Sequence, residues 1–128
     1  MKTRIRSKMV SATLGLVASL SIPAVSTATY NATVIGTVVY VQQDSPSVGY
    51  TPETFTFTVT NQPNLNCGSG FAYFVVSPNS VTDAQTRKNL LTLVLFAKAT
   101  GGQIEVAYDK NGGFCDQGMI GVYYVVAL

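Results

Sequence analysis

The side chains that most often carry enzymatic chemistry are scarce in this sequence. It contains no histidine, which removes the commonest general acid or base and every histidine-activated serine or cysteine nucleophile. Asp44 and Glu53 share one stretch and have the residue types of a glycosidase carboxylate pair, but solvated loop charges explain them more simply. We therefore predict that the protein is not an enzyme and needs no cofactor.

A metal site is weakly indicated as well. The stretch Asp109-Lys110-Asn111-Gly112 is similar to the start of a calcium-binding loop, but the later acidic ligands of that pattern are missing. The same residues are typical of a tight turn between two strands. We expect a turn here and no metal.

Sugar binding is the chemistry that the composition supports best. A sugar ring is held by an aromatic face under its C–H groups, with hydroxyl, amide and carboxylate partners around it. Such side chains gather between residues 40 and 50, and the predicted glycan-binding set is Tyr40, Gln42, Asp44 and Tyr50. An outward-facing row of threonines between residues 54 and 60 adds a polar face nearby. One alternative stays open, in which Tyr40 packs in the core and the loop after it only connects two strands.

The N-terminus is typical of an export signal. Four basic residues within the first eight positions precede the apolar run 9–22, which Pro23 and the small residues Ser26-Thr27-Ala28 follow. The run is short for a membrane span. We expect residues 1–28 to be a cleaved signal peptide and the product to be secreted or periplasmic, with a retained membrane anchor as the alternative.

Residues 29–128 are predicted to form a single domain. They keep four of the eight basic side chains and all six acidic ones, so the net charge changes from +2 to −2. A nucleic-acid-binding protein needs a basic surface that displaces phosphate counterions. We therefore expect no nucleic-acid partner and no membrane span.

Cys67 and Cys115 are the only cysteines, and we predict that they form a disulfide because an exported protein folds in an oxidising compartment. The bond would close a loop of roughly 49 residues, which the chain-entropy description credits with about 4 kcal/mol. For a domain of this size that is a large part of the net stability. Two free thiols are the alternative.

Alternating and β-branched runs predict five strands, with one helix between the third and the fourth. The strands are expected at residues 29–42, 54–60, 71–77, 103–108 and 119–128. Gly36 interrupts the first run, which suits a bulge or bend in a long strand that two sheets share. The helix should begin near Ser80 or Thr82 in a capping box and end at Gly101-Gly102.

This layout predicts an OB-fold, a five-stranded Greek-key barrel that is mainly β with one helix. In that topology the third and fifth strands lie parallel, so Cys67 and Cys115, which precede them, become neighbours. An α+β sheet crossed by one helix is the rival architecture. The second half of the helix is unusual, because residues 90–99 are apolar on almost every side.

The end of the helix and the strand after it carry a resemblance to a known family. Within residues 93–106, the stretch Thr100-Gly101-Gly102-Gln103-Ile104 resembles the Thr-Gly-Gln type turn before a valine- or isoleucine-rich strand in the B subunits of bacterial AB5 toxins. The likeness is nearest to the subtilase-cytotoxin and pertussis-like group. The resemblance implies an OB-fold, a homopentameric ring with helices around a pore, cell-surface glycan binding, a catalytic A subunit as partner and a role in virulence.

In such a ring the apolar half of the helix would pack partly against neighbouring subunits. The residues expected to face the oligomer are Leu90, Leu93, Val94 and Ala97. Deep burial of the helix within its own monomer is the alternative. The second functional hypothesis, from a different class, is a small exported structural or inhibitor protein that acts by protein–protein contact and is no toxin component.

Overall fold

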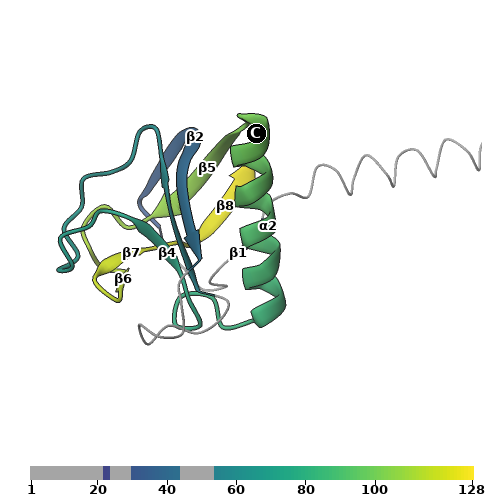
Figure 1. The fold of residues 1–128 in the computed structure, drawn as a ribbon. Coiled ribbons are helices and arrows are strands. Elements are labelled where there is room, and N and C mark those ends of the chain that lie inside the picture. Colours follow the sequence, from purple (N-terminus) through teal and green to yellow (C-terminus); the bar gives the residue numbers. More distant parts are fainter. Residues whose placement is uncertain (1–21, 24–29, 44–53) are drawn as a thin grey trace, which may run out of the picture.

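The computed structural model describes residues 22–23, 30–43 and 54–128 (Figure 1). In these residues the protein is mainly β, with one helix and one curled sheet of eight strands. The order across the sheet is β1-β8-β5-β2-β3-β4-β7-β6. The elements are β1 (Ile22–Pro23), β2 (Ala32–Gln43), β3 (Phe55–Val59), β4 (Phe74–Val76), α2 (Ala84–Thr100), β5 (Gln103–Tyr108), β6 (Cys115–Asp116), β7 (Met119–Gly121) and β8 (Tyr124–Ala127).

The curl of the sheet depends on β2, which changes partner along its length. Residues 32–37 pair with β5 and residues 38–43 pair with β3, and the register shifts just after the change. Gly36 lies beside this point, where an added Cβ would come within 2.7 Å of the Thr60 hydroxyl oxygen. A long first strand with two partners is therefore confirmed, and Gly36 lets the end of β3 approach closely.

The last predicted strand, residues 119–128, divides into β7 and β8. β7 pairs in parallel with β4, and β8 pairs antiparallel with β5. At the end of β7 the ring of Phe114 packs so closely on Gly121 that an added Cβ would meet it at 2.9 Å. The parallel pairing that we expected between the strands after Cys67 and Cys115 is confirmed.

The predicted five strands are nevertheless wrong in number and in order. The split of the last strand adds one strand, and the two-residue strands β1 and β6 add two more. The helix accordingly lies between the fourth and fifth strands of the chain. Two-residue strands carry too little alternation to be recognised in a sequence, since the pattern needs four residues or more.

The helix α2 begins later than the sequence predicts. Its N-cap is Asp83, whose carboxylate accepts a hydrogen bond from the Thr86 N–H at 2.8 Å. Ser80 instead accepts the Ser77 N–H at 2.9 Å in the turn before the helix. The helix ends as predicted at Gly101, which adopts the left-handed conformation with a φ of 68°.

The core lies between α2 and the inner face of the sheet. Its largest fully buried side chains are Phe55, Phe57, Phe74, Leu90, Ile104 and Ile120. Thr54 and Thr56 are also buried, with exposed fractions of 0% and 3%, so the predicted outward-facing threonine row is wrong at this end of β3. Both faces of the strand are covered there, which an alternating sequence does not reveal.

Most of the predicted export signal lies outside the described residues. The described part, Ile22–Pro23, is β1 and pairs with Val125 and Tyr124 of β8. No helix within the described ranges is long and apolar enough to cross a membrane.

Candidate functional site

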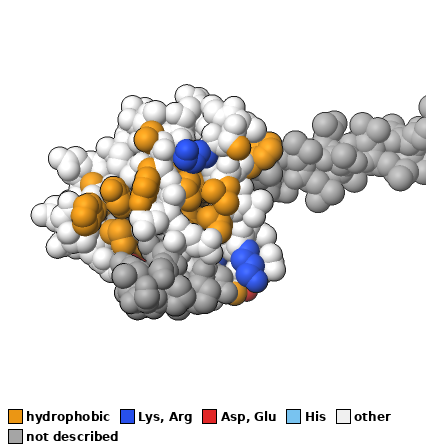
Figure 2. Space-filling model, in the orientation of Figure 1, with side chains coloured by type: hydrophobic (Ala, Val, Ile, Leu, Met, Phe, Trp, Pro, Cys, Tyr) orange, Lys and Arg blue, Asp and Glu red, His pale blue; other side chains and the backbone are white. Residues whose placement is uncertain are grey.

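Exposed hydrophobic side chains are numerous for so small a protein. Figure 2 shows one face of the molecule, on which hydrophobic side chains form separate patches and charged side chains are few. The most exposed large ones are Tyr30, Val39, Phe71, Leu95, Phe96 and Leu128, each at least 47% exposed. Exposed apolar patches mark interaction surfaces, so their neighbours decide what they can bind.

Two of the predicted glycan-binding residues, Tyr40 and Gln42, lie together at the end of β2. The Tyr40 hydroxyl donates a hydrogen bond to the side-chain oxygen of Gln42. Tyr40 is 36% exposed, so the alternative that buried this side chain in the core does not hold. The other two predicted residues, Asp44 and Tyr50, lie outside the described residues.

Two aromatic side chains from a distant part of the sequence form a row with Tyr40. Tyr73 lies beside Tyr40 with the ring centroids 5.5 Å apart, and Phe71 lies beside Tyr73 at 5.4 Å. Adjacent rings are tilted by 40° and 33°, and Phe71 is 58% exposed. Tyr40, Tyr73 and Phe71 are termed the aromatic row. It forms one apolar surface across the end of β2 and the residues before β4.

Sequence reasoning missed Phe71 and Tyr73 because the pattern places them in a strand from 71 to 77. Alternation gave no signal for them, because Val75 shares their parity and is as fully buried as Phe74 and Val76. Phe71 and Tyr73 lie before the strand, which is limited to Phe74–Val76. Their exposure is set by the fold and not by a local pattern.

The loop of residues 61–73, which carries the last two rings, is fixed to its surroundings by hydrogen bonds. The Gln62 amide donates to the Ala72 carbonyl at 2.7 Å and accepts the Val59 N–H at 3.0 Å. The Ser69 N–H donates to a carbonyl of the β6–β7 turn at 3.2 Å. The loop is thus joined to β3 at one end and to the β6–β7 turn near the other.

The predicted disulfide between Cys67 and Cys115 is present, with the Cα atoms 5.7 Å apart. It ties the middle of the 61–73 loop to β6. Leu65 of the same loop packs against the core. These contacts hold the aromatic side chains in place before any ligand arrives, which lowers the entropy lost on binding.

A small pocket opens beside Phe71. It has a volume of about 200 Å³ and is lined by Asn64, Leu65, Asn66, Gly70, Phe71 and Ala72. The side-chain oxygen of Asn66 accepts the Gly68 N–H at 2.9 Å. The Asn64 side chain has no hydrogen-bond partner among the described residues. This hollow, termed the asparagine pocket, therefore offers an unoccupied amide next to an exposed ring.

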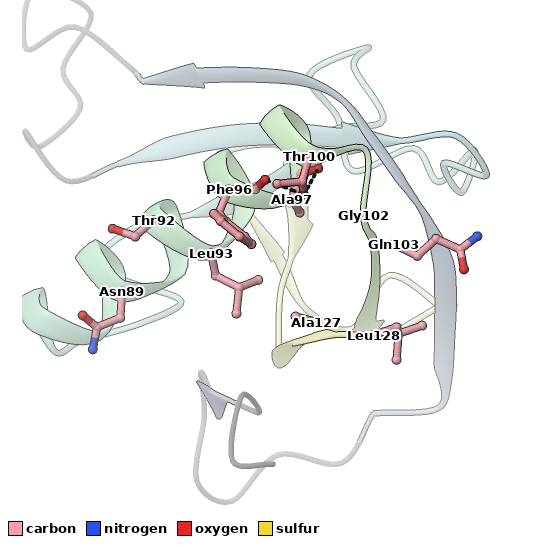
Figure 3. A pocket seen from close by; sticks show the side chains of 10 residues that line it. All are labelled: Asn89, Thr92, Leu93, Phe96, Ala97, Thr100, Gly102, Gln103, Ala127 and Leu128. Atoms are coloured by element: carbon pink, nitrogen blue, oxygen red, sulfur yellow. Dashed lines mark hydrogen bonds between the residues drawn. The ribbon is translucent and has the colours of Figure 1, made fainter. Parts of the chain in front are cut away.

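A larger hollow lies along the C-terminal half of α2 (Figure 3). Its volume is about 440 Å³, and it lies between the helix, the start of β5 and the end of β8. Leu93 and Phe96 project from the helix toward Ala127 and Leu128. Phe96 is 70% exposed and Leu128 is 65% exposed. This hollow is termed the apolar groove, because hydrocarbon makes up most of its surface.

Three of the four residues predicted to face other subunits pack in the core of their own chain. Leu90 and Val94 are fully buried and Ala97 is 5% exposed, all within the core of the same chain. They form the stripe of the helix that packs on the sheet, with spacings of three and four residues. Leu93 alone remains half-buried and lines the apolar groove.

The stretch that resembles a calcium loop forms a turn, as predicted. The Asp109 carboxylate accepts the Asn111 N–H at 2.9 Å and the Asn31 side-chain amide at 2.8 Å. These hydrogen bonds, the backbone one first, hold the pKa of Asp109 below its usual value. In the part of the chain that the structure describes, no group of three or more histidine, cysteine or acidic side chains could hold a metal ion.

Comparisons of the chain with protein families, with curated proteins and with solved structures found no match. The aromatic row and the asparagine pocket together present three rings and two side-chain amides. Such a set can bind a ligand by stacking and hydrogen bonding. The residues of the row and the pocket include no carboxylate, cysteine or histidine that could act as a base or a nucleophile.

Proposed function

We propose that this protein binds glycans through the aromatic row and the asparagine pocket and that it is not an enzyme. One observation carries the proposal: neighbouring rings about 5.5 Å apart run without a break into a pocket with a free amide. The C–H faces of sugars stack on such rings, and their hydroxyl groups exchange hydrogen bonds with amides. Gln42 at one end of the row and Asn64 at the other supply these partners.

An OB-fold-like barrel is supported by the pairing of the longer strands. β2 pairs with β3 and β5, β3 pairs with β4, and β7 and β8 together connect β4 back to β5. If β7 and β8 are counted as one interrupted strand, this sequence of neighbours is that of a five-stranded Greek-key barrel, with β1 and β6 as short additions. OB-folds use strand and loop surfaces to bind oligosaccharides.

We infer in addition that the protein assembles as a homopentamer through the C-terminal half of α2. Support comes from Leu95 and Phe96, which are 47% and 70% exposed, and from Leu93 in the apolar groove. An exposed aromatic side chain beside an apolar hollow is typical of the centre of a protein interface. The proposed protein is thus a secreted B subunit of an AB5-type toxin, with a cell-surface glycan and a catalytic A subunit as its partners.

The second candidate is a small exported structural or inhibitor protein that acts by protein–protein contact. The apolar groove favours it, because a hydrocarbon-lined hollow can take a side chain from an unrelated protein as well as from a second copy. The two candidates differ in what they expect of the aromatic row. Only the first requires it to bind sugar.

A glycan array probed with the purified protein tests the first proposal. We expect binding to a limited set of glycans, about tenfold weaker binding in Tyr73→Ala and unchanged binding in Tyr30→Ala. Tyr30 is a matched control, since it is 47% exposed but makes an edge-to-face contact with Tyr124 outside the row. Absence of binding to any glycan would overturn the proposal.

Light scattering of the purified protein tests the oligomer. We expect a mass about five times that of one chain, as closed cyclic symmetry requires of a ring of five. A clean monomer at micromolar concentration would rule out the homopentamer and leave contact with a different protein as the use of the groove.

A further inference from the structure

We propose that the asparagine pocket holds a single neutral sugar ring, one without a carboxylate or any other negative charge. This inference rests on the proposed glycan binding and names the class of ligand for the same site. Three features of the pocket carry it: its size, the absence of charge in its lining, and the protein acceptors that three nearby N–H groups already have.

The size of the pocket limits it to one ring. Its volume of about 200 Å³ is below the roughly 300 to 1,000 Å³ of pockets that enclose a whole small molecule. The aromatic row continues from Phe71 to Tyr73 and Tyr40. The next sugar units of an oligosaccharide can therefore lie on the row while the terminal ring occupies the pocket.

The lining of the pocket carries no charge. Its six residues are two asparagines, a leucine, a glycine, a phenylalanine and an alanine. The basic residues of the described chain lie elsewhere in the fold, three of them on α2 and Lys110 in the turn after β5. One of the three, Arg87, donates to the carbonyls of Val81 and Thr82. A carboxylate needs a cation or several N–H donors to replace its water, and no side chain of this lining supplies a cation.

Backbone N–H groups could replace a cation, and three of those in or beside the pocket already have protein acceptors. The Gly68 N–H donates to the Asn66 side chain, the Ser69 N–H to the β6–β7 turn, and the Phe71 N–H to the Ser69 hydroxyl at 3.2 Å. An anion-binding nest requires successive N–H groups that point at one ligand. These three N–H groups point at protein acceptors instead.

The lining side chains offer a ligand the Asn64 amide, the NH2 group of Asn66 and the exposed side of Phe71. An amide offers donors and an acceptor, which is the combination that a sugar hydroxyl needs. Phe71 has no hydroxyl, so it contributes only an apolar surface for C–H groups. An amide N–H can donate to a carboxylate as well, but none of these groups carries the positive charge that would offset the desolvation of an acidic sugar, so the lining favours a neutral pyranose.

A glycan array with matched pairs tests this inference. Each pair consists of a neutral oligosaccharide, such as one that ends in galactose or glucose, and the same oligosaccharide capped with sialic acid. We expect the neutral member to bind and its sialylated partner to bind at least about tenfold more weakly, because the added carboxylate meets no cation. Asn64→Asp replaces the free amide by a carboxylate of the same shape and should weaken neutral binding about tenfold.

Asn111→Asp in the turn after β5 is the matched control, since Asn111 is exposed and lines neither hollow, and we expect it to leave the neutral signal unchanged. A second measurement does not depend on any variant. In a titration of the wild-type protein with the best neutral glycan, NMR amide shifts should centre on residues 64–73 and not on α2.

The outcomes separate the inference from the proposed function. A preference for sialylated members, or an Asn64→Asp variant that binds like the wild type, overturns the neutral-sugar inference alone if Tyr73→Ala still weakens binding about tenfold. Failure of every glycan to bind overturns both. A preference for neutral members with shifts at residues 64–73 supports both.

Discussion

The aromatic row and the apolar groove both expose a phenylalanine, yet they differ in everything around it. Phe71 lies at the end of a row with two tyrosines and beside two asparagines, on a loop fixed by a disulfide and by hydrogen bonds. Phe96 lies on the face of a helix, over a hollow lined mainly by hydrocarbon. One surface mixes rings with polar groups, and the other is mainly apolar.

This difference shows that the exposure of an aromatic ring does not by itself indicate a function. A ring with amides at its edge can satisfy both the C–H groups and the hydroxyls of a sugar. A ring beside hydrocarbon satisfies only another apolar surface, such as a second protein chain. We therefore expect changes at one surface to leave the binding at the other intact.

The largest effect should come from removal of the disulfide, which supports only one of the two surfaces. Cys67→Ser with Cys115→Ser should lower the free energy of unfolding by about 4 kcal/mol, because the unfolded chain is no longer closed into a loop. Chemical denaturation measures this change. Among the molecules that remain folded, glycan binding should weaken while self-association persists. A loss below about 1 kcal/mol, or equal weakening of both bindings, would contradict the prediction.

Substitution of Phe96 and of Phe71 should have opposite effects on self-association and on glycan binding. Phe96→Asp should weaken self-association by roughly thirtyfold or more, as expected for an aromatic side chain at the centre of an interface, and should spare glycan binding. Phe71→Asp is its matched partner and should do the reverse. Both side chains are more than half exposed, so the folded monomer should tolerate either change. Light scattering and the glycan array measure the two effects, and a variant that impairs both would refute the separation.

Tyr73 distinguishes stacking from hydrogen bonding within the aromatic row. Its ring lies between those of Tyr40 and Phe71, so Tyr73→Ala removes the middle of the row and should weaken glycan binding about tenfold. Tyr73→Phe keeps the ring and should change the affinity by less than about twofold if stacking dominates. Titration calorimetry with an array-positive glycan measures both. An equal loss in the two variants would show that the hydroxyl, and not the ring, carries the binding.

Local chemistry made much of the fold predictable from the sequence. β5 lies at the predicted residues 103–108, the helix ends at the predicted Gly101, and the cysteines pair as expected. The strand and the helix end depend on short-range signals, strict alternation and a glycine after the last turn. The disulfide was predicted because the sequence has only two cysteines and begins like an export signal. The start of the helix was harder to predict, because Ser80, Thr82 and Asp83 are all residue types that can cap a helix. In the structure Ser80 accepts the Ser77 N–H in the preceding turn, and Asp83 accepts the Thr86 N–H as the N-cap.

The candidate site was less predictable because it joins segments more than thirty residues apart. Tyr40 and Gln42 could be chosen for their types, but no local pattern shows that Tyr73 lies beside them. That contact follows from the pairing of β2 with β3 and of β3 with β4. In the same way, the apolar circumference of α2 does not reveal which side packs on the sheet. Leu90 and Val94 were therefore predicted to face neighbouring subunits, with burial in their own monomer as the alternative, and they lie in the core.

Acid should weaken the N-cap of α2, the helix that lines the groove, and so lower the stability of the protein. This is the smallest effect that we predict. Hydrogen bonds from the Thr86 side chain and then from its N–H lower the pKa of Asp83 below its ordinary value of 3.8. A carboxylate whose pKa is lower in the folded state stabilises the protein above the pKa of the unfolded chain. This contribution is lost as the pH falls through the folded value. Thermal unfolding of the wild type should therefore shift to lower temperature below about pH 4. Asp83→Asn should shift less, because asparagine still caps the helix but does not titrate. Asp109→Asn is the comparison variant in the turn after β5. The pKa of Asp109 is also lowered, so this variant should reduce the loss of stability in acid in the same direction without a change in α2. If Asp83→Asn and the wild type lose stability in parallel as the pH falls, the carboxylate of Asp83 does not contribute to the acid sensitivity of the protein.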